Sequence, residues 1–222
     1  MSQLKTETRG RKPKVVAAFD FSKIKTFKAR DLKFDESLFK PFKTNRELDV
    51  ILSTEGGLMP GTNLMIAGGP GSGKTTVCLD ILSCFTPQKI KGIFISGEMD
   101  EIGYYKYCKR IPKFDCIETL FLKNYADNAK EAIEYIFEKS WEVVVIDSVA
   151  ELLDMVKYQT KMTQGECERW LIELQDKHKK GGNPENINTT FINIQQVTKG
   201  NDFVGSNRLK HMMDAFAIIK VS

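Results

Sequence analysis

The chain has 222 residues, which is enough for one α/β domain with a substantial core and a short additional arm. Hydrophobic residues make up 41% of it and charged residues 28%, within the range of globular proteins. No apolar run approaches the roughly 20 residues of a membrane span, and the N-terminus carries no apolar signal region, so we expect neither a membrane-spanning nor a secreted protein.

The net charge of +4 is unevenly distributed along the chain. Residues 1–43 hold twelve Lys and Arg against five Asp and Glu, a net charge of +7, whereas the remaining residues carry a net charge of −3. A basic arm on a slightly acidic body favours an electrostatic contact with a polyanion.

The cysteines are Cys78, Cys84, Cys108, Cys116 and Cys167, and no two of them form a CxxC pair. This spacing predicts neither a zinc site nor a redox motif. Most of them fall in segments that otherwise predict helices, so we expect reduced thiols that are buried as small apolar side chains. Reduced cysteines favour a cytoplasmic location.

Hydrophobic patterning divides the chain into three parts. Residues 1–14 have almost no large apolar side chains and predict a disordered basic tail. Residues 15–46 mix phenylalanines with charges without a clean period, which predicts an arm that packs these rings on the body or on a neighbouring subunit. Residues 47–222 alternate between strand and helix patterns and predict one domain.

The predicted elements of this domain follow one another in a regular alternation. The predicted strands are 64–67, 92–96, 119–122, 143–146, 189–194 and a last strand near 216–221. The predicted helices are 74–85, 101–110, 129–139 and 163–179, and the stretch between Asp154 and Gln164 is predicted as a loop. Strands that alternate with helices predict an α/β fold with a mostly parallel central sheet and helices on both faces.

Residues 68–75 read GGPGSGKT and match the phosphate-binding pattern G-x-x-x-x-G-K-[ST] between an apolar strand and a helix. The glycines let successive backbone N–H groups face a phosphate at the positive end of the helix. In this pattern Lys74 reaches the β- and γ-phosphates and the Thr75 hydroxyl binds Mg²⁺. The predicted cofactors are therefore ATP and Mg²⁺, and the predicted nucleotide-binding residues are Gly68, Gly69, Pro70, Gly71, Ser72, Gly73, Lys74, Thr75 and Thr76. The pattern also suits a small-molecule kinase.

A second nucleotide motif lies in residues 141–148, which read WEVVVIDS. Four β-branched residues predict a central strand, and Asp147 emerges at its carboxyl end, where α/β sheets bind ligands. There a carboxylate can hold the Mg²⁺ water shell opposite Thr75. The alternative is a strand-terminal aspartate that caps the next helix.

From about residue 44 to 221 the chain resembles the RecA superfamily, and within it the ATPase domain of the RadA/Sms repair proteins, with KaiC and DnaB-type helicases as more distant relatives. Four segments carry the resemblance: 47–61 (ELDVIL…GGLMPG), 95–98 (ISGE), 146–148 (IDS) and 195–214 (QQVTKG…LKHMMD). The last of these is a long gapped match that distinguishes the chain from the kinases, whose arginine-rich lid has no counterpart here.

The resemblance implies a catalytic set of Lys74, Glu98 and Gln196, in which Glu98 orients and activates the attacking water. Gln196 takes the position of the polar residue that senses the γ-phosphate. Its amide can donate to a phosphate oxygen and accept from a loop N–H. The alternatives are a solvated acid that opens the next helix for Glu98, and a polar cap at a strand end for Gln196.

The resemblance also implies a segment that faces DNA directly after Gln196, with Lys199, Phe203 and Arg208 as the predicted contacts. The predicted loop before Gln164, with Lys157 and Lys161, is a second candidate. The alternative interpretation of these cations is that they are solvated surface charges without a partner. A mobile segment with cations and one aromatic ring suits single-stranded DNA, because the cations follow the backbone and the ring stacks on a base.

The sequence therefore predicts an ATP hydrolase of DNA recombination or repair whose turnover is coupled to single-stranded DNA. The alternative is a KaiC-like regulatory ATPase or autokinase that acts on protein partners. The resemblance implies a homo-oligomer, a ring or a filament. The zinc module and the protease-like domain of RadA have no counterpart in these residues. The KNRFG element, which reaches the nucleotide of a neighbouring subunit in that family, has none either, so no residue is assigned to that role. RecA-like ATPases of this compact form resemble phage proteins, which would place the chain in the cytoplasm of an infected bacterium.

Overall fold

The computed structural model describes residues 24–197 and 207–220. The chain divides into two units, 1–34 and 35–222. The described part of the first unit contains the short 3-10 helix η2 (Ala29–Asp31). The second unit contains the sheet and all other helices described below, together with the predicted nucleotide motifs.

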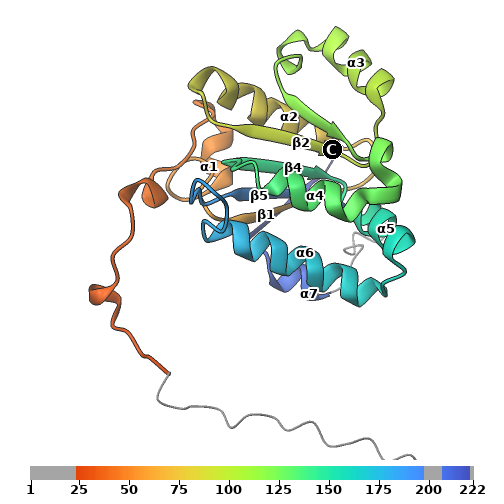
Figure 1. Ribbon diagram of the computed structural model, residues 1–222. Coiled ribbons are helices and arrows are strands. Elements are labelled where there is room, and N and C mark those ends of the chain that lie inside the picture. Colours follow the sequence, from red (N-terminus) through yellow and green to blue (C-terminus); the bar gives the residue numbers. More distant parts are fainter. Residues whose placement is uncertain (1–23, 198–206, 221–222) are drawn as a thin grey trace, which may run out of the picture. The chain divides into compact units, whose positions relative to one another are not determined.

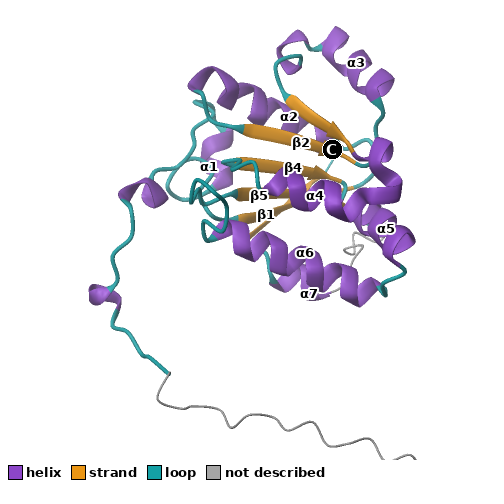
Figure 2. Ribbon diagram, in the orientation of Figure 1, coloured by secondary structure: helices purple, strands orange, loops and turns teal. Residues whose placement is uncertain are grey.

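Six parallel strands of the described residues form one sheet in the order β3-β2-β4-β5-β1-β6 (Figure 2). Because all strands run in the same direction, their carboxyl ends lie at one edge of the sheet, where α/β proteins bind ligands. The strands are β1 (Asn63–Gly68), β2 (Gly92–Ser96), β3 (Glu118–Phe121), β4 (Val143–Asp147), β5 (Thr190–Gln196) and β6 (Ala215–Ile219).

Helices cover both faces of this sheet (Figure 1). Helices α1 to α3 pack on one face and α4 to α7 on the other, as the two core clusters show. The α-helices are α1 (Leu48–Leu52), α2 (Lys74–Phe85), α3 (Glu101–Arg110), α4 (Ala129–Phe137), α5 (Val149–Thr160), α6 (Gln164–Lys179) and α7 (Asn207–His211). Short 3-10 helices are η3 (Glu36–Phe39), η4 (Thr86–Gln88), η5 (Pro112–Phe114) and η6 (Leu122–Asn128).

The alternation of side chains along β2 shows how the sheet separates two cores. Phe94 points to the face of α2, where it is buried with Leu79 and Phe85. Its neighbours Ile93 and Ile95 point to the opposite face and are buried in the cluster that includes α4 and α5. Successive side chains of a strand point to opposite faces, so an uninterrupted apolar run is needed when both faces are covered.

The predicted fold, a parallel sheet with helices on both faces, is confirmed. The bounds of α2, β2 and α3 agree with the predicted ranges. The predicted loop between Asp154 and Gln164 is wrong, because α5 continues to Thr160. The residues that bury this helix recur at helical spacing, and they are Val149, Leu152, Leu153 and Val156.

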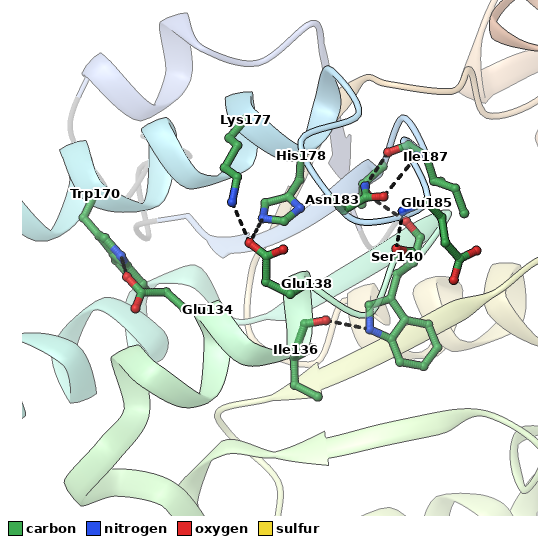
Figure 3. Close-up of polar contacts among 12 residues, drawn as sticks. Glu134, Ile136, Glu138, Ser140, Trp170, Lys177, His178, Asn183, Glu185 and Ile187 are labelled. Carbon is green, nitrogen blue, oxygen red and sulfur yellow. Dashed lines mark hydrogen bonds and ion pairs between the residues drawn. The ribbon is translucent and has the colours of Figure 1, made fainter.

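Side chains on α4 and α6 hold these two neighbouring helices together (Figure 3). Trp170 Nε1 donates to Glu134 Oε1 at 2.8 Å. Near the ends of the helices, Lys177 Nζ donates to Glu138 Oε1 at 2.5 Å. The same carboxylate oxygen lies 3.8 Å from Nε2 of His178, whose side chain is fully buried.

The segment that precedes α1 packs on the sheet unit through one of the phenylalanines of the predicted arm. Phe42 exchanges backbone hydrogen bonds of 2.8 and 2.9 Å with Leu58, and its ring lies 6.0 Å from that of Phe85. Phe39 is exposed. The carboxylate of Asp49 accepts hydrogen bonds from Thr44 and from the backbone of Asn45, which fixes the start of α1.

All five cysteines are free thiols. Cys78 and Cys167 are buried as predicted, whereas Cys84 and Cys108 are only partly buried and Cys116 is exposed. Within the described ranges, no helix has the length and apolar character that crossing a membrane requires.

Candidate nucleotide site

The phosphate-binding loop connects β1 to α2 at the carboxyl edge of the sheet. Gly71 and Gly73 have φ angles of 72° and 89°, which side chains other than glycine rarely adopt, and Gly73 directly precedes the helix. The ammonium of Lys74 donates to the carbonyl oxygens of Gly68 and Gly69, both at 2.9 Å. Lys74 is therefore held over the loop by two of the loop's own carbonyl groups.

Thr75, in the first turn of α2, meets Asp147 at the end of β4. The Thr75 hydroxyl donates to Asp147 Oδ2 at 2.6 Å. Burial of the carboxylate raises the pKa of Asp147 to about 6, and nearby Glu98 also raises it, whereas the Thr75 hydrogen bond and Lys74 act in the opposite direction. A buried carboxylate with an opposing hydroxyl is a suitable place for a hard cation.

Glu98 and Gln196 come from the ends of β2 and β5. Gln196 Nε2 donates to Glu98 Oε1 at 3.3 Å, and Glu98 is exposed. The backbone N–H of Gly97 donates to the carbonyl oxygen of Asp147 at 2.7 Å, so the main chain before Glu98 is fixed to the end of β4. The main chain next to Glu98 is thus fixed, whereas the Glu98 side chain extends into solvent.

One pocket of about 360 Å³ brings these groups together, although they are far apart in the sequence. It is lined by most of the phosphate loop and the start of α2, by Glu98, Asp147 and Gln196, and by two side chains that the sequence analysis missed, Met99 and Tyr107. The Arg110 guanidinium lies 4.6 Å from the centre of the Tyr107 ring. Tyr107 follows the buried Tyr104 by three residues, so helical spacing could have placed it on the inner side of α3.

A larger cavity of about 450 Å³ lies elsewhere and is lined in part by Asp35, Ser37 and Glu142. Both of these carboxylates already have partners, because Asp35 accepts from the backbone of Ser37 and Glu142 accepts from the backbone of Lys91. The larger cavity contains none of the predicted nucleotide residues, so the smaller pocket is the candidate site.

The predicted metal ligands suit Mg²⁺, which binds oxygen atoms and keeps several waters and phosphate oxygens in its shell. Thr75 and Asp147 supply one hydroxyl and one carboxylate at hydrogen-bond distance. Within the described ranges, no three His, Cys, Asp or Glu side chains gather as a metal site. The Thr75 and Asp147 oxygens fit a cation whose other ligands are water and phosphate oxygens.

The predicted DNA contacts that the structure describes are Lys157, Lys161 and Arg208, and none of these three lines the nucleotide pocket. Lys157 is exposed on α5 and Lys161 is exposed just after it, whereas Arg208 is exposed on α7. Lys199 and Phe203 lie outside the described residues. Near Lys157 and Lys161, Tyr158 is 73% exposed and has the Lys161 ammonium 4.4 Å from the centre of its ring.

The parallel sheet, the phosphate loop between β1 and α2, and the polar residues at the ends of β2, β4 and β5 define a RecA-like P-loop ATPase fold. Two solved structures share this fold: a KaiC-like protein of Pyrococcus horikoshii (TM-score 0.58, 16% identity, 81% of this chain and 80% of that chain) and the flagellar accessory protein FlaH of Methanocaldococcus jannaschii (TM-score 0.51, 11% identity, 78% and 76%).

In sequence the chain is RadA-like. It is 29% identical over 175 residues to the DNA repair protein RadA of Campylobacter jejuni and 27% identical over 181 residues to that of Helicobacter pylori. These matches cover 77% and 81% of this chain but 36% and 38% of the relatives, so the chain spans well under half the length of either. No protein-family model matches the chain. The predicted resemblance to the RecA superfamily, and to RadA within it, is confirmed.

Proposed function

We propose that this chain binds ATP with Mg²⁺ and hydrolyses it, and that its turnover is coupled to the binding of single-stranded DNA. The convergence of the phosphate loop with Glu98, Asp147 and Gln196 on one pocket carries the proposal. The curated relatives are named DNA repair proteins, which supports DNA as the partner.

Each polar group of the pocket has a distinct proposed role. The loop N–H groups and Lys74 bind the phosphates, and Lys74 then exchanges its two carbonyl partners for phosphate oxygens. Thr75 and Asp147 would hold Mg²⁺, which when bound neutralises charge on the β- and γ-phosphates. Thr76, which also lines the pocket, binds the nucleotide beside them.

Glu98 is the proposed base, which accepts a proton from the attacking water. In the structure one of its carboxylate oxygens accepts from Gln196. A γ-phosphate offers the Gln196 amide a second anionic acceptor, and an amide that turned to the phosphate would release the Glu98 carboxylate toward water. The same movement would shift the end of β5 and the segment that follows it, which links the phosphate to the proposed DNA contacts.

The proposed DNA contacts combine cations with aromatic rings, as single-strand binding requires. At the end of α5 the exposed Tyr158 ring lies between Lys157 and Lys161 in sequence, and Lys161 contacts its face. Lys199, Phe203 and Arg208 remain proposed contacts of the segment after β5. Assembly of several copies into a ring or filament also remains a proposal.

The decisive experiment measures ATP turnover at low salt with and without single-stranded DNA, with Mg²⁺ and with a chelator. We expect turnover that requires Mg²⁺, rises with DNA, and is lost in Lys74→Ala. Turnover that DNA does not change would contradict the DNA partner and favour the KaiC-like alternative, in which the partner is a protein. Absence of any Mg²⁺-dependent turnover would contradict the hydrolase itself.

A further inference from the structure

The 3-10 helix η6, which follows β3, contacts the loop that carries Glu98. Lys123 Nζ donates to the backbone carbonyl oxygen of Glu98 at 2.5 Å. The next residue, Asn124, donates through Nδ2 to Glu101 Oε1 at 2.5 Å, at the start of α3. Two adjacent side chains of η6 therefore hold both ends of the short connection between Glu98 and α3.

The rest of this connection is fixed from the opposite side. The backbone N–H groups of Gly97 and Glu98 both donate to the carbonyl oxygen of Asp147, at 2.7 and 3.3 Å. The Ser96 hydroxyl exchanges hydrogen bonds of 2.9 and 3.0 Å with the backbone of Met99. The end of β4 thus holds the N–H of Glu98, and Lys123 holds its carbonyl group.

We propose that Lys123 is a positioning residue that aims the Glu98 carboxylate at the nucleotide. A hydrogen bond from a charged donor is stronger than a neutral one, and it fixes the orientation of the peptide that follows Glu98. The direction of the Glu98 side chain depends on that backbone orientation. This inference rests on the proposed role of Glu98 as the base.

If Lys123 had a purely structural role, its substitution would lower the stability of the fold. We expect a different result from a positioning residue. Its side chain is exposed and lies outside both hydrophobic cores, so its removal should leave the fold intact. It does not line the nucleotide pocket, so its removal should not weaken nucleotide binding. Its loss should instead lower the rate of the chemical step.

The test compares Lys123→Met, which removes the charge but keeps the length, with Lys123→Arg, which keeps a charged donor. Lys180→Met is the control, because Lys180 is also exposed and pairs with Asp176 of α6. We expect Lys123→Met to lower kcat by roughly 10- to 100-fold, the scale of a misplaced catalytic group. The KM, the affinity for a fluorescent ATP analogue and the Tm should stay at wild-type values, and Lys123→Arg should recover much of the rate.

A double-mutant cycle with Glu98→Gln shows whether Lys123 acts through Glu98. We expect Lys123→Met to add no further loss of rate in the Glu98→Gln background. Losses that multiply, or a wild-type kcat in Lys123→Met while Glu98→Gln is slow, would overturn the positioning role. Normal turnover in Glu98→Gln itself would instead overturn the proposed base, so the two failures are distinguishable.

Discussion

The Thr75 hydroxyl donates a 2.6 Å hydrogen bond to Asp147 Oδ2, although the two residues are 72 positions apart. The contact joins the phosphate loop to the end of β4 and places a carboxylate in a buried position. Burial raises the pKa of Asp147 from its ordinary value of 3.8 to about 6. Without a bound cation, the folded protein is therefore less stable above pH 6 than it would be with a neutral side chain at this position.

Asp147→Asn should stabilise the nucleotide-free protein above pH 6. Because the folded protein binds the Asp147 proton more tightly than the unfolded chain does, the stability contributed by this group is largest below pH 3.8 and is lost as the pH rises through about 6. We expect a gain on the order of 2–3 kcal/mol in the free energy of unfolding at pH 8 and a much smaller gain at pH 4. Denaturant unfolding at both values checks this.

The same variant should lose the response to ligand. Mg²⁺ with ATP should raise the Tm of the wild type, because a ligand that binds the folded state stabilises it, and should raise that of Asp147→Asn far less. Asp154→Asn, on the exposed side of α5, is the control and should behave as the wild type. A nucleotide-free Asp147→Asn that is less stable at pH 8 would refute the burial argument.

Glu98→Gln should bind ATP but hydrolyse it at least ~10²-fold more slowly, because the amide cannot accept the proton from water. Glu118→Gln, an exposed acid at the start of β3, is the matched control and should turn over normally. Single-turnover hydrolysis together with nucleotide binding separates the two steps. If Glu98→Gln turned over at the wild-type rate, Glu98 would be a surface acid and the base would lie elsewhere.

The double variant Tyr158→Ala, Lys161→Ala should bind single-stranded DNA roughly tenfold or more weakly, since stacking on one aromatic ring contributes ~1–3 kcal/mol per base. Its ATPase activity without DNA should not change. Tyr135→Ala, Lys139→Ala is the control, because Lys139 also contacts the face of an exposed tyrosine, on a different helix. Equal DNA affinities of the two variants, measured at low salt, would argue against a contact at the end of α5.

His178 should make the protein less stable in mild acid. Neither ring nitrogen has a hydrogen-bond partner among the described residues, and burial lowers the pKa of His178, with Lys177 acting in the same direction and Glu138 against it. The unfolded chain therefore takes up the proton first, so stability falls as the pH drops below about 6.5, by at most about 1.4 kcal/mol per pH unit.

The measurement is the free energy of unfolding between pH 5 and 7. His178→Leu should flatten its slope relative to the wild type. His211→Gln should leave the slope unchanged, because His211 is exposed on α7. A wild-type slope in His178→Leu would mean that other groups cause the acid sensitivity.

Local patterns in the sequence were sufficient for the sheet and for the phosphate loop. The bounds of α2 follow from the glycines before Lys74, and β4 follows from its β-branched run before Asp147. The second half of α5 was predicted as a loop, although the apolar residues of its buried side recur at helical spacing up to Val156. Apolar patterns with a fixed spacing thus predicted most helices and strands. In α5 the apolar pattern and the exposed Lys157 occur in the same segment.

The contacts that could not be predicted depend on the packing of distant elements. Tyr107 enters the pocket because α3 packs beside the phosphate loop, and Lys123 reaches Glu98 because β3 pairs with β2. Neither residue belongs to a motif, and each lies on an element whose own pattern only specifies its secondary structure. The tertiary arrangement alone determines what these side chains touch.

The order of the strands also has a consequence for the folding of the chain. β5 lies between β4 and β1 in the sheet, so the end of β1 cannot approach the end of β4 in its final geometry until β5 has been inserted. Such parallel pairings between distant segments form slowly. A chain synthesised only as far as β4 would already contain the whole phosphate-loop sequence, yet it would lack the strand that sets the distance between Lys74 and Asp147. Nucleotide binding would thus mark the insertion of β5 into the sheet.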